Sequence, residues 1–337
     1  MSVNKLLAAA ITATTFSTVA AAADVTVYGK ANVTLNQYDI EQLGATTQDN
    51  WKMESNASRL GVKGSIPVND SLKVIYKMEY ETYIDDGDKS GNTFSQRNIY
   101  GGLQGNFGTV IAGKNDTPTK LAQGKVDKFN DLPLADIKNV FVGENRASNI
   151  IMYTTPTMSG FSVTAAIMPG EDNGTGSDDD DGLADYISAA VTYTQDNIYI
   201  ALASDSDVSG NDVVRLVGEY SFSDFKIGLM YQNAEEADTA MGLDDDGDYE
   251  EQTGYLLSGA WSINSNWAVK AQYAFAENTR IDNGDDDETT SMSVGADYKL
   301  NKQSKVFAYY SNVTTEQSGS TDLYDGSTFA VGYELKF

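Results

Sequence analysis

The strongest constraint on the fold is the alternation of side chains over the last residues of the chain, 326–337. Apolar side chains occupy every second position up to the C-terminus, and small or charged residues fill the positions between them. Residues two apart in a β-strand point to the same face, so the segment predicts a strand with one wholly apolar face. The apolar positions are Phe329, Val331, Tyr333, Leu335 and Phe337.

The same period of two recurs along the chain from residue 24 onward, for example over 25–35, 72–80 and 267–275. A period of two at these lengths indicates strands rather than helices. We find no domain boundary, so we expect one domain over 24–337. The predicted strands number sixteen and lie near 25–38, 54–67, 71–84, 94–105, 108–114, 146–157, 160–169, 184–195, 197–205, 212–222, 224–234, 250–263, 266–277, 288–300, 303–314 and 327–337.

Two kinds of connection alternate between these strands. Some are short and rich in turn residues, as at 69–70 and 223–224, and others are long, polar and acidic, as at 171–183 and 235–249. Tight turns at one rim and long loops at the other are typical of a barrel that spans an outer membrane, with its turns on the periplasmic side. We therefore expect an all-β fold, a sixteen-stranded antiparallel transmembrane β-barrel. A secreted β-sandwich or β-helix would show longer apolar runs and no such alternation.

Aromatic residues near the predicted strand ends fit this interpretation, because Tyr and Trp gather at membrane interfaces. We expect them to form two outward-facing belts. The residues concerned are Tyr76, Tyr100, Tyr255, Trp261, Trp267, Tyr298 and Tyr309.

The N-terminus predicts export. Lys5 precedes a short apolar run, 6–11, and a run of four alanines ends at Ala23. A positive start, a short apolar segment and small residues are typical of a secretory signal peptide, which we expect over 1–23. The apolar run is far shorter than the roughly 20 residues that a spanning helix needs.

Composition excludes several function classes. Beyond residue 23 the chain keeps 22 basic and 49 acidic residues, a balance of −27, and it contains neither Cys nor His. Histidine-based catalysis, cysteine nucleophiles and the usual zinc ligands are therefore excluded, and we expect no enzyme activity, cofactor or metal site. Strong acidity argues against nucleic acid as a partner. The acidic runs lack a calcium-loop spacing, although a weak divalent-cation site that bridges to lipopolysaccharide stays open.

One connection departs from the pattern. Residues 115–145 show no alternation, yet they carry apolar side chains that the other loops lack. Long loops are usually functional or disordered, and apolar residues favour an ordered, packed loop. These residues are Leu121, Val126, Phe129, Leu132, Leu134, Ile137, Val140 and Phe141.

Several segments resemble the general bacterial porins of Gram-negative bacteria: 24–29 (DVTVYG), 58–64 (SRLGVKG), 105–108 (GNFG), the loop after the fifth strand, and the C-terminal Phe337. The resemblance covers the whole chain after residue 23. It implies a homotrimeric, water-filled channel for the passive diffusion of ions and small hydrophilic solutes. It also implies contact with outer-membrane lipid and lipopolysaccharide, and recognition of Tyr333, Leu335 and Phe337 by the barrel assembly machinery.

In that family the third external loop folds inward and faces a basic wall. The matching wall positions are Arg59, Arg97 and Arg146, which Lys63 and Lys77 extend. Arg97 shares the parity of its apolar neighbours Ile99 and Leu103, so a lumen position requires a β-bulge or a twist of the strand. Loop carboxylates that could face the wall are Asp116, Asp127, Asp131, Asp136 and Glu144. We expect Asp127, Asp131 and Asp136 to do so, with Asp127 and Asp131 on one face if a helical turn forms there.

An alternative function stays open at this point. A barrel with a plugged lumen could act as a surface receptor, adhesin or structural anchor. A plug requires a separate domain or several inward loops, whereas a single candidate loop is visible in the sequence.

Overall fold

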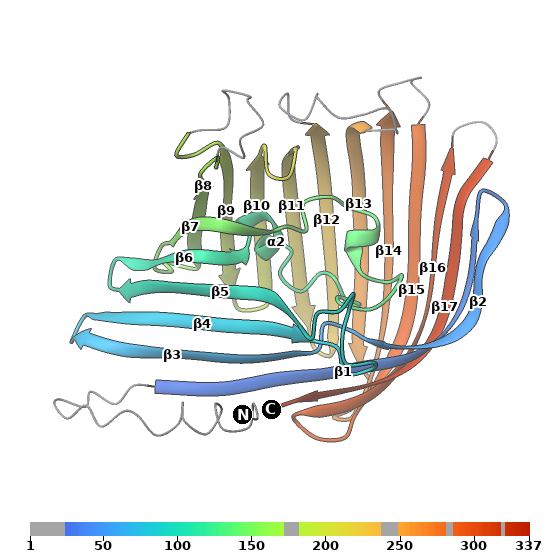
Figure 1. Ribbon diagram of the computed structural model, residues 1–337, viewed down its shortest axis with the longest axis horizontal. Helices are drawn as coiled ribbons and strands as arrows, with labels where there is room; N and C mark the ends of the chain where they lie inside the picture. Colours follow the sequence, from blue (N-terminus) through green and yellow to red (C-terminus); the bar gives the residue numbers. More distant parts are fainter. Residues whose placement is uncertain (1–23, 172–181, 237–248, 281–285, 318–320) are drawn as a thin grey trace, which may run out of the picture.

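The computed structural model describes residues 24–171, 182–236, 249–280, 286–317 and 321–337. The leader predicted over 1–23 and most of the acidic runs lie outside these residues. The described strands form one antiparallel sheet (Figure 1). They are β1 Asp24–Gln42, β2 Ala45–Ser55, β3 Arg59–Asn69, β4 Leu72–Thr82, β5 Phe94–Gly105, β6 Gly108–Asp116, β7 Arg146–Thr154, β8 Phe161–Met168, β9 Tyr186–Gln195, β10 Ile198–Ser206, β11 Asn211–Phe222, β12 Phe225–Glu236, β13 Tyr249–Ser262, β14 Trp267–Arg280, β15 Asp286–Lys299, β16 Ser304–Gln317 and β17 Thr321–Lys336.

The sheet closes into a barrel because β17 pairs with β1. Two backbone hydrogen bonds join the very end of the chain to β1, from Gly29 N to Phe337 O at 2.9 Å and from Phe337 N to Gly29 O at 3.1 Å. A closed barrel leaves no unpaired strand edge in lipid. The closing strand predicted from the C-terminal alternation is therefore confirmed.

The barrel has sixteen strand positions, as predicted, because β2 and β3 are two halves of one strand. Both pair with β1, β2 along its second half and β3 along its first. Ala57 interrupts them with a left-handed φ of 47°. Hydrogen bonds hold the residues around this break against β1. Asn56 N donates to Asn32 O at 2.8 Å, and Ser58 Oγ accepts from Asn32 N at 2.9 Å.

The first hairpin extends further than the sequence predicted. The predicted strands near 25–38 and 54–67 become β1 and β2–β3, and a tight turn at Leu43 and Gly44 joins β1 to β2. Residues 39–53 are mostly polar, so the alternation that marks lipid-facing strands is absent there. Backbone pairing does not need that alternation, and strands can continue above the membrane with two polar faces.

Alternating positions separate an apolar outer surface from the lumen. Leu202 on β10, Leu216 on β11 and Leu229 on β12 are about half exposed, whereas Arg215 is fully buried on the opposite face. Trp261 and Trp267 face outward, as the aromatic-belt prediction requires. Tyr100 and Tyr309 do not, since both pack among buried inner-face residues, and the prediction is wrong for those two.

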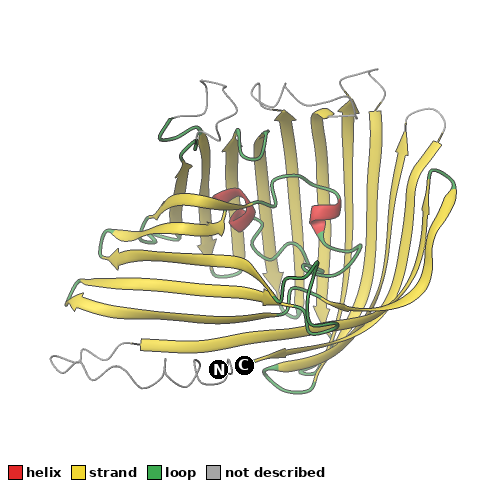
Figure 2. Ribbon diagram, in the orientation of Figure 1, coloured by secondary structure: helices red, strands yellow, loops and turns green. Residues whose placement is uncertain are grey.

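The long connection between β6 and β7 folds into the barrel and carries the described helices α2 Pro118–Ala122 and η1 Ile137–Asn139. In Figure 2 both red helices lie between the near strands and the far wall. Val126 and Phe141 pack against the inner-face residues Val217 and Leu256. The prediction of an ordered, packed loop is therefore confirmed. No helix among the described residues has the length and hydropathy needed to cross a bilayer.

Candidate functional site

A cavity of about 770 Å³ lies where residues 117–145, the inner loop, face strands β3, β4 and β5. Charged side chains dominate its lining. The carboxylates are Glu54, Glu81, Asp85, Asp86, Asp88, Asp116, Asp127, Asp131, Asp136 and Glu144, and the basic residues are Lys52, Arg59, Lys89, Arg97, Lys120, Lys125, Lys138 and Arg146. A narrow space of this kind acts on ions and polar solutes through its width and its lining charge.

The inner loop touches the basic wall at Asp131. Its carboxylate lies 2.7 Å from the guanidinium of Arg59 on β3 and 2.6 Å from the ammonium of Lys30 on β1. Asp131 has a left-handed φ of 69°, which turns the loop at this point. Loop and wall are therefore in direct contact here, and the charges are paired rather than separated by water.

Arg97 reaches the lumen through a β-bulge, one of the two routes, a bulge or a twist, that its parity left open. Met78 pairs with Ile99 but Tyr80 pairs with Gln96, so β5 carries one extra residue between these pairs. The extra residue rotates the Arg97 side chain to the inner face. Its Nε donates to Glu79 at 3.1 Å and its Nη1 to Glu81 at 2.8 Å.

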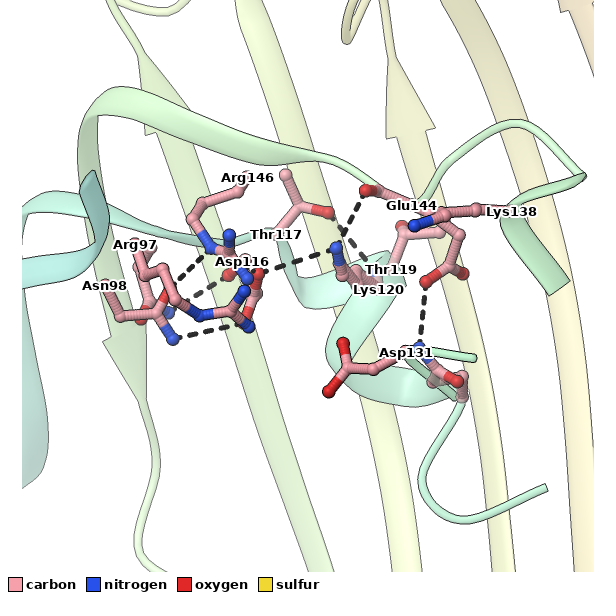
Figure 3. A network of polar contacts seen from close by, with 12 residues as sticks. Arg97, Asn98, Asp116, Thr117, Thr119, Lys120, Asp131, Lys138, Glu144 and Arg146 are labelled. Atoms are coloured by element: carbon pink, nitrogen blue, oxygen red, sulfur yellow. Dashed lines mark hydrogen bonds and ion pairs between the residues drawn. The ribbon is translucent and has the colours of Figure 1, made fainter. Parts of the chain in front are cut away.

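Arg146 is the first residue of β7, directly after the inner loop, and its side chain faces Asp116 at the end of β6. Its Nε lies 2.9 Å from Asp116 and 2.8 Å from the side-chain oxygen of Asn98. Figure 3 shows Lys120 of α2 on the other side of Asp116, with its ammonium 3.7 Å from Asp116 and 2.9 Å from the carbonyl of Glu144. The structure thus brings all three predicted arginines to one wall.

Lys63 and Lys77 occupy directly opposed positions on β3 and β4, nearer the short turns than Arg59. Lys77 lies 3.4 Å from Glu79 and so extends the charged wall. Lys63 stacks over the ring of Tyr28, with its ammonium 5.3 Å from the ring centroid. Neither side chain lines the cavity of about 770 Å³.

Two of the expected loop carboxylates are turned into the inner loop itself. Asp127 accepts from the backbone N–H groups of Phe129 at 2.8 Å and Ile137 at 3.3 Å. Asp136 accepts from the N–H of Asp131 at 2.8 Å. Residues 127–131 form no helical turn, so Asp127 and Asp131 point apart. The expected pairing of Asp127 and Asp136 with the arginines is therefore corrected, because backbone N–H groups of the loop take their oxygens.

The pKa values of two buried carboxylates of the inner loop are shifted in opposite directions, because their charged neighbours differ. Burial, together with the neighbouring Asp136 carboxylate, raises the pKa of Asp127 to about 7. Burial also acts to raise the pKa of Asp131, but Lys30 and Arg59 outweigh it and lower that pKa to about 2. Asp131 is thus ionised at neutral pH, whereas Asp127 titrates near neutrality.

The inner loop is held from the opposite wall by Arg215, which the sequence predictions missed. Arg215 lies fully buried on β11. Its Nη1 donates to Glu144 at 2.7 Å, its Nη2 to the carbonyl of Val142 at 3.1 Å, and its Nε to Gln232 at 2.8 Å. An arginine at an inward position between Val214 and Leu216, which both face outward, was the sequence signal for this role.

Three glutamines on adjacent strands continue this attachment. Gln232 on β12 donates to Val142 O at 3.1 Å, and Gln252 on β13 donates to Val140 O at 3.2 Å. Gln272 on β14 accepts from the N–H of Lys128 at 2.8 Å. Irregular backbone needs partners when it is buried, and these side chains supply them.

Glu79, Glu81 and Lys30 also belong to the charged wall and were not predicted. Both glutamates share an inner face with Lys77, which the alternation of β4 already indicated. Lys30 needed the tertiary structure, because it lies opposite Arg59 only in the register of β1 against β3. No cluster of His, Cys, Asp and Glu in the described ranges is arranged to hold a metal ion.

Comparison with known proteins gives consistent matches. The model of the Gram-negative porin family matches residues 7–318. Outer membrane porin protein 32 of Delftia acidovorans is 25% identical over 331 residues, which cover 93% of this chain and 90% of that protein. The solved anion-selective porin from Comamonas acidovorans has a TM-score of 0.72 at 20% identity, covering 94% of this chain and 100% of that chain. OmpT of Vibrio cholerae in its trimer form has a TM-score of 0.67 at 19% identity, over 94% and 100% of the two chains.

Proposed function

The chain belongs to the Gram-negative porin family and forms an outer-membrane β-barrel channel for the passive diffusion of solutes, and from this premise we propose that the inner loop and the wall of β1 and β3 to β7 form its constriction. The observation that carries the proposal is the contact of Asp131 with Arg59 and Lys30. It fixes the loop against one wall, while Arg215 and the three glutamines fix it against the other. A sixteen-stranded barrel is otherwise wide enough for an open aqueous channel.

The constriction sorts solutes mainly by size. Five basic side chains of the wall, Lys30, Arg59, Lys77, Arg97 and Arg146, are paired with four carboxylates, Glu79, Glu81, Asp116 and Asp131. Pairing cancels most of the field that separated charges would produce. Small hydrophilic solutes and ions of either sign pass, and the barrel carries out no covalent chemistry on them.

Assembly follows the family pattern in this proposal. Residues 1–23 are removed on export, and the barrel assembly machinery recognises the strand that carries Tyr333, Leu335 and Phe337. The barrel forms a homotrimer in contact with membrane lipid and lipopolysaccharide. Support for the trimer comes from the solved trimer form of OmpT, which shares the fold.

Reconstitution in a planar bilayer tests the channel and its constriction together. We expect stepwise conductance for the full chain, and larger steps with a higher solute size limit after removal of residues 124–139. Removal of 238–247, which lie outside the described residues, is the matched control and should leave both quantities unchanged. Equal effects of the two deletions would contradict the constriction, and a barrel that stays closed would favour a receptor or anchor.

A further inference from the structure

A second cavity, with a volume of about 400 Å³, lies between the inner loop and the far wall of the barrel. Residues 138–145 of the loop form one side of it. The other side consists of lumen-facing residues near the loop ends of five strands, namely Asn211 on β11, Gln252 on β13, Asn278 on β14, Thr289 on β15 and Thr315 on β16. We call this cavity the amide pocket. Cavities of about 300–1,000 Å³ hold small-molecule ligands, so the amide pocket has room for a small solute.

The barrel wall around the amide pocket keeps charged and uncharged polar residues on opposite faces. Exposed glutamates occupy the outward-facing positions next to four of the pocket residues, and these are Glu251, Glu277, Glu288 and Glu316. Their inward neighbours are the uncharged residues Gln252, Asn278, Thr289 and Thr315. Because adjacent residues of a strand point to opposite faces, the carboxylates at the loop ends of these strands lie outside the barrel.

The two charged residues that line the amide pocket already have partners. Both carboxylate oxygens of Glu144 accept hydrogen bonds, Oε1 from the guanidinium of Arg215 at 2.7 Å and Oε2 from the side-chain amide of Gln123 at 2.8 Å. The ammonium of Lys138 lies 4.0 Å from the carboxylate of Asp136. A charged solute would lose hydration in the pocket and gain no net attraction there, which is unfavourable. The lining therefore favours uncharged, polar solutes.

Other polar groups of the amide pocket keep hydrogen-bonding capacity that the protein leaves unused. Asn139, Asn145 and Asn211 each donate through the side-chain nitrogen to a backbone carbonyl, at 3.0, 3.5 and 2.9 Å. Their side-chain oxygens accept no hydrogen bond from any residue that the structure describes. The hydroxyls of Thr289 and Thr315 lie 3.2 Å apart, and only one of them can donate to the other. The second hydroxyl hydrogen is free, so the pocket offers acceptors and a donor together.

Sugars match this combination of groups. Each sugar hydroxyl both donates and accepts hydrogen bonds, and a neutral sugar carries no charge that the pocket would have to balance. A polyether, which only accepts hydrogen bonds, can use the free threonine hydroxyl but leaves the three asparagine oxygens without a donor.

We propose that the amide pocket binds a neutral polyhydroxylated solute, a sugar of one or two rings, before the solute enters the constriction. The proposal rests on the open lumen of the proposed function. Lys138, Asn139 and Glu144 line both the amide pocket and the charged cavity, so a bound sugar lies directly beside the constriction. Occupancy of the pocket therefore reduces the ion current.

Titrations with maltose test the proposal in two independent ways. In single-channel recordings of the full chain, we expect maltose to interrupt the current, and the blocked fraction should saturate in the millimolar range, as a few hydrogen bonds would give. Calorimetric titration of the detergent-solubilised barrel should give the same half-saturating concentration without any need for conduction. Tetraethylene glycol dimethyl ether, which accepts but does not donate hydrogen bonds, should not saturate in that range.

Two double variants separate the amide pocket from the rest of the barrel. Thr289→Val with Thr315→Val removes both hydroxyls from the pocket at nearly constant side-chain shape, and should raise the half-saturating concentration of maltose about 5-fold or more. Thr290→Val with Thr314→Val changes the next cross-strand pair, which faces outward, and should leave that concentration unchanged. Equal half-saturating concentrations in the two double variants would overturn the proposal.

Failure of the proposal is distinguishable from failure of the channel function. Open channels whose response to maltose does not saturate, or saturates equally with the polyether, would overturn the sugar site alone. Barrels that insert but never conduct would contradict the channel function, and the calorimetric titration would still decide whether the amide pocket binds maltose.

Discussion

The carboxylate of Asp131 at the tip of the inner loop lies 2.7 Å from the guanidinium of Arg59, which is 72 positions away in the sequence. The pair joins the loop to the wall that the loop faces. The side-chain exposures are 17% for Asp131 and 20% for Arg59, so solvent still reaches both groups. Substitutions here therefore change the charge that a passing ion meets.

Substitution of Asp131 by Asn should shift ion selectivity toward anions, because Lys30 and Arg59 lose their shared counter-charge. Arg59→Gln should shift it toward cations. For the wild-type pore we expect a mild cation preference that grows on dilution, since the acidic loop side is less screened at low salt. Reversal potentials under a salt gradient measure this, with Asp224→Asn in a turn as control. Strong anion selectivity of the wild type at every salt concentration would show that the arginine wall dominates.

Arg215→Met should destabilise the barrel strongly, because it leaves the carboxylate of Glu144 buried without its partner. Breaking a buried ion pair in this way costs about 3–5 kcal/mol. The second substitution Glu144→Gln, added to Arg215→Met, should recover part of that free energy. Thermal unfolding midpoints in detergent measure the effect. Lys52→Met removes an exposed pairing with Glu54 and should cost less than about 1 kcal/mol.

Asp127 should give the barrel a pH-dependent stability. Its pKa of about 7 in the folded protein lies above the ordinary value of 3.8 for an aspartate in an unfolded chain. Between these two pKa values the folded state holds a proton that the unfolded state has lost. The free energy of unfolding therefore falls as the pH rises from about 4 to about 7. Asp127→Asn should flatten this part of the profile of unfolding midpoints. The chain has no histidine to titrate in the same range. The control variant Asp224→Asn should keep the pH dependence of the unfolding midpoint. If Asp127→Asn keeps it as well, the pH dependence belongs to other groups.

Deletion of Phe337 should impair insertion into the outer membrane. It removes both backbone hydrogen bonds with Gly29 and the apolar end of the closing strand. We expect low surface levels and degradation in the periplasm, measured by cell fractionation and surface labelling. Phe107→Ala removes an exposed aromatic residue from a turn between β5 and β6 and should leave these levels unchanged. Normal surface levels of the truncated chain would contradict an assembly role for Phe337.

Local chemistry explains why so much of the barrel could be predicted. A period of two and its outward apolar face follow from strand geometry alone, and turn residues mark where each strand ends. The sixteen strand positions, the closing strand and the packed inner loop therefore needed no tertiary information. Arg59 and Arg146 could likewise be placed at the lumen from parity and from their positions beside the loop.

Partners across the lumen were decided by the tertiary structure. Lys30 meets Asp131 only through the register of β1 with β3 and the left-handed turn of the loop at Asp131. The Asp127 carboxylate points into the inner loop itself, because it accepts hydrogen bonds from backbone N–H groups of the folded loop. Arg97 needed a bulge, and Arg215 needed a loop folded over it. The sequence by itself determined which residues share a strand face, because that depends on neighbours along the chain. Which charges meet depends on register, bulges and loop path, which arise only when distant strands pair.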